Sequence, residues 1–78
     1  MTNSKMAYDE IENLFSSLFD ELASVLNEAN SKELQLFFNA GEYGLAYDTL
    51  ISIIDNEKVS KSQKMTSEIE KLKALMEI

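Results

Sequence analysis

The stretch FNAGEYGLAYDTL, residues 38–50, contains both glycines of the chain and decides how its middle part folds. Gly41 stands where one apolar helical pattern stops, so we expect it to take the left-handed C′ conformation that ends a helix. Gly44 lies just inside the next pattern, where glycine costs about 1 kcal/mol relative to alanine. The stretch therefore predicts two helices joined by a tight turn, and it poses the question of why Gly44 is there.

Apolar residues on both sides of this turn recur at helical spacing. Leu34, Phe37 and Phe38 predict a short helix over residues 32–40, with Asn30 and Glu33 as its capping pair. A longer helix is predicted over residues 43–56. Its buried arc comprises Tyr43, Ala46, Tyr47, Leu50, Ile53 and Ile54, and its opposite side comprises Gly44, Asp48, Ser52 and Asp55.

A first helix is predicted over residues 8–27, because its apolar residues fill one arc of the helical wheel. That arc comprises Ile11, Leu14, Phe15, Leu18, Leu22, Val25 and Leu26. Every acidic residue of the segment falls outside the arc, and Asp9, Glu12 and Asp20 form one ridge with Ser16. Since the segment contains no lysine, we expect its outer face to be strongly negative.

A last helix is predicted over residues 61–77, with Ser60 and Gln63 as a capping box. Its apolar stripe comprises Met65, Ile69, Leu72 and Met76, and lysines and glutamates flank the stripe. The chain shows no strand-like alternation and contains no proline. These patterns predict one all-α domain over residues 1–78, a small four-helix bundle-like fold with tight loops.

The charge is large and unevenly placed. The 78 residues include 14 acidic residues and 7 lysines, a formal net charge of −7. Residues 1–57 carry a net charge of −9, and residues 58–78 carry +2. This balance argues against direct binding of nucleic acid or of an anionic membrane surface, and it favours a basic protein partner. A chain without cysteine, signal-peptide pattern or membrane-length apolar run suits the cytoplasm.

Few residues suit catalysis. The chain contains no histidine and no cysteine, so the common catalytic triads and zinc sites cannot be built. Phosphate-binding loops and calcium loops are absent. Asp48 and Asp55 lie two turns apart on one helix face, but a bundle of this size has hardly enough layers to enclose them in a cleft. We therefore expect no enzymatic activity, no cofactor and no metal site.

One motif resembles a known family. The segment AGEYGLAYDTL is similar to the helix start of MafI-type immunity proteins of bacterial polymorphic toxin and contact-dependent inhibition systems. The matching residues are Glu42, Tyr43, Gly44, Ala46 and Leu50. The resemblance implies a small, acidic, all-helical protein that binds a cognate toxin, often a nuclease, and blocks its action. The lysine-bearing last helix lies outside the pattern.

Charge and motif together predict a partner-binding surface for a toxin with a basic cleft. For Tyr43 and Tyr47 the sequence leaves two places open, the core and a partner interface, because tyrosine is a frequent interface anchor. The candidate residues are Asp9, Glu12, Asp20, Glu42, Tyr43, Tyr47, Asp48 and Asp55. For Gly44, close packing inside the domain is favoured slightly over close approach of a partner.

Two other functions stay open. One is an acidic helical adaptor or regulatory protein that acts by protein–protein binding, for example as a homodimer. The other is a mimic of DNA that acts on a transcription or restriction protein. The gene upstream discriminates between these hypotheses, because a large secreted protein that ends in a short basic toxin domain would support immunity.

Overall fold

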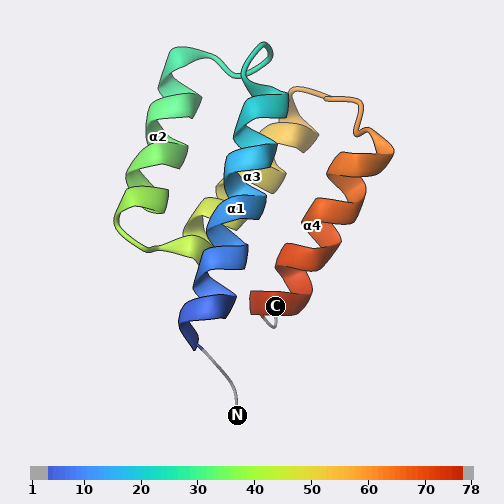
Figure 1. The fold of residues 1–78 in the computed structure, drawn as a ribbon. Helices are drawn as coiled ribbons and strands as arrows, with labels where there is room; N and C mark the ends of the chain where they lie inside the picture. Colours follow the sequence, from blue (N-terminus) through green and yellow to red (C-terminus); the bar gives the residue numbers. More distant parts are fainter. Residues whose placement is uncertain (1–3, 77–78) are drawn as a thin grey trace. The chain divides into compact units, whose positions relative to one another are not determined.

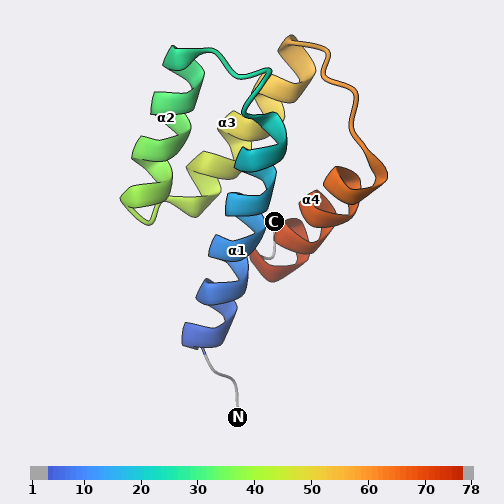
Figure 2. The same ribbon diagram turned by 45° about the horizontal axis from the view of Figure 1, so that its top comes forward.

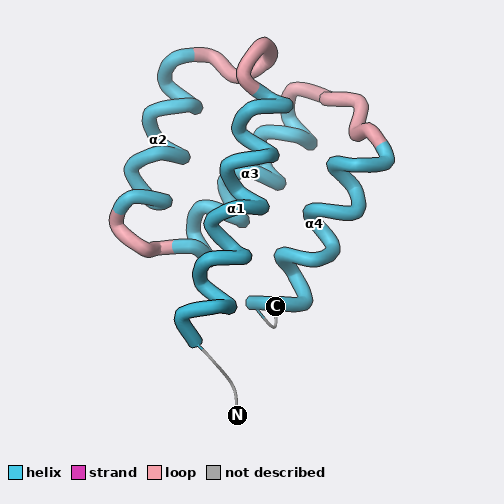
Figure 3. The backbone as a smooth tube through the Cα atoms, viewed as in Figure 1, coloured by secondary structure: helices cyan, strands magenta, loops and turns pink. Residues whose placement is uncertain are grey.

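The computed structural model describes residues 4–76, and side chains from residue 8 onward. Four helices and no strand lie within this part of the chain (Figures 1 and 3), so the predicted all-α class is confirmed. The helices are α1 (Ser4–Leu22), α2 (Glu28–Asn39), α3 (Tyr43–Asn56) and α4 (Gln63–Met76). The bounds of α3 are those predicted, whereas the other three helices differ at one or both ends.

The helices pack in two pairs, and each pair belongs to a separate unit. One unit contains α1 and α4, which come from the two ends of the chain. The other unit, residues 23–60, contains α2 and α3. Within each pair the two helices run in opposite directions (Figures 1 and 2). The α2–α3 pair is therefore local in sequence, whereas the α1–α4 pair joins distant segments.

Helix α1 is shorter at its carboxyl end than predicted. Its buried residues follow the expected spacing and are Ile11, Phe15, Leu18 and Leu22. The rings of Phe15 and Phe19 lie 5.8 Å apart. The helix ends at Leu22, so the prediction that it continues to residue 27 is wrong, and Val25 is 47% exposed instead of buried.

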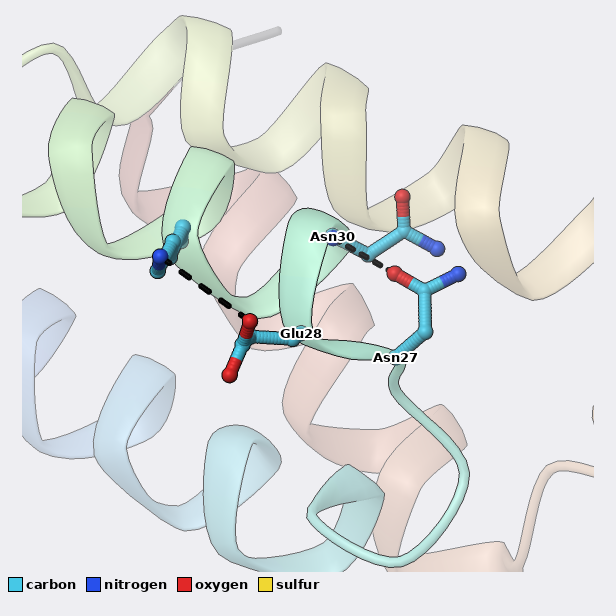
Figure 4. Close-up of polar contacts among 4 residues, drawn as sticks. Asn27, Glu28 and Asn30 are labelled. Atoms are coloured by element: carbon cyan, nitrogen blue, oxygen red, sulfur yellow. Dashed lines mark hydrogen bonds and ion pairs between the residues drawn. The ribbon is translucent and has the colours of Figure 1, made fainter.

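The reason for this early end is the cap of α2. Asn27 has extended backbone angles, φ −80° and ψ 171°, and its Oδ1 accepts a hydrogen bond of 2.7 Å from the backbone N–H of Asn30 (Figure 4). The predicted cap at Asn30 is therefore wrong, and α2 begins at Glu28. The Glu28 carboxylate lies 4.0 Å from the Lys32 ammonium, an exposed pair that contributes little to stability.

Gly41 ends α2 as predicted. Its φ is +75°, its N–H donates to the carbonyl of Phe38 at 3.1 Å, and the N–H of Glu42 donates to the carbonyl of Phe37 at 2.8 Å. These two bonds define a Schellman motif. The same motif ends α3, where Lys58 takes the left-handed position with φ 52°. Lysine gives no sequence signal for this conformation, which glycine adopts without strain.

Helix α4 begins at Gln63 and is capped by a residue other than the one predicted. The Oγ of Ser62 accepts a hydrogen bond of 3.0 Å from the backbone N–H of Met65, so the predicted box of Ser60 and Gln63 is wrong. Met65 and Leu72 of the predicted stripe are buried. Glu68 is buried as well, at 8% exposure, although the sequence placed it on a flank.

Candidate partner-binding surface

The first part of the candidate surface is the α1 ridge, which we define as Asp9, Glu12 and Asp20. All three side chains are exposed, and their spacing places them on one side of the helix, away from the buried arc. Helix α1 begins at Ser4 and so includes Lys5, which the predicted helix did not. From residue 8 to its end at Leu22, α1 contains no lysine. This length of α1 thus presents carboxylates to solvent.

The second part is the α3 strip, which we define as Gly44, Asp48 and Asp55. These residues share one side of α3 and are all exposed. Both carboxylates lie in solvent, two helical turns apart. The α3 strip thus presents two carboxylates to solvent, and the α1 ridge presents three in the other unit.

Gly44 is not explained by packing inside the domain. A Cβ atom added at Gly44 would meet nothing within 4 Å apart from its adjoining residues and the backbone of its own helix, and the residue is exposed. The prediction of close internal packing is therefore wrong, because this side of α3 faces outward. Helix α3 thus carries a glycine in its first turn without an internal compensation.

The first turn of α3 has two further features that do not favour the fold of the free protein. Glu42 occupies the N-cap position, but its side chain makes no capping hydrogen bond. Leu45 is 48% exposed. Serine or aspartate at the cap, alanine at Gly44 and a polar residue at Leu45 would each suit the free protein better. Residues that disfavour the local helix and make no compensating contact inside the domain are typical of binding sites.

The two predicted tyrosines are half-buried. The ring of Tyr43 lies 5.8 Å from that of Phe38 at an interplanar angle of 55°, so Tyr43 contributes to the packing of α3 on α2. The six acidic candidates, by contrast, are exposed, and three belong to each unit. The acidic candidates are Asp9, Glu12, Asp20, Glu42, Asp48 and Asp55.

A pair of carboxyl groups lies between α1 and α4. The Oγ of Ser62 donates a hydrogen bond of 3.3 Å to Oε1 of Glu21. A hydrogen bond with the Glu68 side chain, partial burial and the charge of Glu68 raise the pKa of Glu21 above its usual value, and Ser62 and Lys64 oppose this. The helical wheel placed Glu21 on the outer face. The sequence did contain a signal that Glu68 is buried. This residue lies three residues after Met65 and four before Leu72, on the apolar arc of α4.

Residues 4–76 contain no group of three or more acidic side chains arranged to hold a metal ion. Among the helices described, none combines the length and apolar character needed to cross a bilayer. No protein-family model matches the chain, and no curated protein or solved structure is significantly similar to it. The candidate surface thus rests on the geometry and charge of the chain itself.

Replacing Gly44 and Gly41 by alanine should change the free energy of unfolding in opposite directions. Gly44→Ala should raise the free energy of unfolding by about 0.5–1 kcal/mol, because it improves helix propensity and meets no neighbouring atom. Gly41→Ala should lower it by about 1–2 kcal/mol, since its φ of +75° strains any side chain. Urea denaturation followed by circular dichroism measures both. A destabilising Gly44→Ala would contradict the open space at this position.

Proposed function

We propose that this chain is an immunity protein that binds and neutralises a cognate bacterial toxin domain, a basic nuclease, through its acidic helical surface. The observation that carries the proposal is the exposed first turn of α3. There, Gly44 leaves the backbone bare beside Asp48, and Glu42 and Leu45 face solvent without benefit to the fold. A partner that packs on this turn accounts for all of these features.

Electrostatics supports a basic partner. Residues 1–57 carry a net charge of −9, and the acids of the α1 ridge and the α3 strip are exposed. A nuclease cleft is lined by cations that neutralise phosphates, and helical carboxylates can take the place of those phosphates. Charge of this kind steers association and raises its rate at low salt.

The α3 turn combines the elements of a small interface. Leu45 offers an apolar contact, and Glu42 and Asp48 offer charges close to it in sequence. Interfaces concentrate their binding energy in a few desolvated side chains that are surrounded by a polar rim. The bare backbone at Gly44 permits a partner to approach α3 closely. We infer that this turn belongs to the desolvated part of the contact.

The mechanism needs no chemistry from this chain. By occupying the basic surface of the toxin, the protein keeps the nucleic acid away from the catalytic groups. It would act in the cytoplasm, where the toxin meets its substrate. Tight binding and fast association are then the properties that matter, and carboxylates on rigid helices supply both.

The test begins with the gene upstream. Its basic carboxyl-terminal domain should be expressed, and its association with this protein should be measured by stopped-flow fluorescence from low to physiological salt. We expect the association rate constant to fall by about tenfold or more as salt rises, because screening shortens the range of the steering. Nuclease activity should fall in parallel with complex formation.

The variant Gly44→Ala sharpens this test. It should weaken the complex by about tenfold or more while it stabilises the free protein, since the added methyl group obstructs only a partner. If no toxin gene lies nearby and the chain forms a dimer instead, the immunity proposal fails and the adaptor hypothesis replaces it.

A further inference from the structure

Each of two carboxyl groups in the α1–α4 unit has one buried oxygen without a hydrogen-bond partner. Glu68 of α4 is only 8% exposed, and its Oε1 is buried without a hydrogen-bond partner. Oε2 of Glu21 in α1 is also buried without a partner. The donor that reaches Glu21 from a neighbouring side chain is the hydroxyl of Ser62, at 3.3 Å from Oε1.

Two ionised carboxylates in this arrangement would destabilise the helix pair. Like charges close together in a partly desolvated site repel, and each unpartnered oxygen carries a desolvation cost. The other charged group that acts on Glu21 is Lys64, whose ammonium favours the ionised form. Lys64 is exposed, so solvent screens its effect. One proton placed between the carboxyl groups removes a charge and supplies the missing donor.

We propose that Glu21 and Glu68 share one proton, and that this proton fastens α1 to α4 in mild acid and releases the contact as the pH rises. When two carboxyl groups are held together, one of them keeps its proton to a higher pH, because both cannot ionise without repulsion. The inference is independent of the toxin-binding proposal, because it concerns the cohesion of a helix pair and not its outer face.

The sign of the pH dependence follows from proton linkage. The pKa of Glu21 is raised above its ordinary value of 4.5, chiefly by the hydrogen bond with Glu68. The folded chain therefore binds this proton more tightly than the unfolded chain does. Its contribution to stability is complete below about 4.5 and is lost as the pH rises through the raised pKa. Paired carboxylates with depressed pKa values show the opposite trend.

Glu68→Gln tests the proposal, with Glu70→Gln as the matched control. Both substitutions remove one negative charge from α4, but Glu70 is exposed. The glutamine amide at position 68 supplies a permanent donor to Glu21. We expect Glu68→Gln to raise the melting temperature at about pH 8 and to flatten its decline above the ordinary glutamate pKa of 4.5. Glu70→Gln should keep the decline of the wild-type protein.

A second readout does not depend on unfolding. The side-chain carboxyl carbon of Glu21, followed by NMR, should titrate with a midpoint above 4.5 in the wild-type protein and at a lower pH in Glu68→Gln. Equal pH profiles for both variants, or an unchanged midpoint, would overturn the proposal. Stabilisation at about pH 8 by millimolar Ca²⁺ or Mg²⁺ that Glu68→Gln abolishes would also overturn it, because a cation would then occupy the place of the proton.

Discussion

Phe15→Ala is expected to remove a large part of the stability of the chain. Phe15 is fully buried, at 0% exposure, and its ring lies 5.8 Å from that of Phe19. Truncation of a buried phenylalanine to alanine costs about 3–5 kcal/mol, from lost transfer free energy and from the cavity left behind. A domain of this length has a free energy of unfolding of roughly 4–12 kcal/mol. Urea denaturation followed by circular dichroism measures the loss.

Leu36→Ala is the control for this substitution. Leu36 is 67% exposed on α2, so its truncation should change the free energy of unfolding by less than about 0.5 kcal/mol. Phe15→Leu should fall between the two variants, because leucine fills part of the space. A cost below about 1 kcal/mol for Phe15→Ala would show that α1 is not anchored through this ring.

Charge reversal of the α1 ridge is expected to abolish protection against the proposed toxin. The triple variant Asp9→Lys, Glu12→Lys and Asp20→Lys replaces exposed carboxylates with ammonium groups that a basic partner repels. Acids at the centre of such an interface cost about 2 kcal/mol or more each, so two of them correspond to a roughly 1,000-fold loss of affinity. Equilibrium binding to the toxin domain and survival of toxin-exposed cells measure the effect.

The matched control changes the net charge equally at other places. Glu33, Glu57 and Glu70 are exposed acids outside the α1 ridge and the α3 strip. Their reversal to lysine should slow association but leave the dissociation rate nearly unchanged, since rim charges act mainly on the rate of encounter. If the ridge variant binds as well as this control, the α1 ridge is solvated surface. The interface must then be sought on α3 and α4.

The bounds of α3 could be predicted because local signals mark its start. Gly41 ends the preceding helix, and the apolar spacing from Tyr43 continues without a competing cap. The boundary between α1 and α2 could not be found from spacing alone. Val25 and Leu26 continue the apolar spacing of α1, which predicts a longer helix. The Asn27 side chain instead caps the start of α2, and apolar spacing alone contains no information on that cap.

Part of the candidate surface could be predicted from the sequence. The exposure of Asp9, Asp48 and Asp55 follows from their positions on amphipathic helices, because a helical wheel separates buried from exposed sides. The carboxyl pair of Glu21 and Glu68 was missed, since it depends on which residue of α4 meets α1, a contact between distant segments. The proposed partner would be another molecule, whose shape is not encoded in the periodicity of this chain.

The pairing of α1 with α4 has a consequence for the order of events on the ribosome. Residues 23–60 are complete, and α2 can pair with α3 across a short turn, before α4 has been synthesised. Closing the long connection between α1 and α4 costs roughly 2 kcal/mol more in chain entropy than closing a three-residue turn. Until Met65 and Leu72 leave the exit tunnel, the part of α1 that packs against α4 stays uncovered, and transiently exposed apolar surface of this kind favours aggregation unless a chaperone binds it.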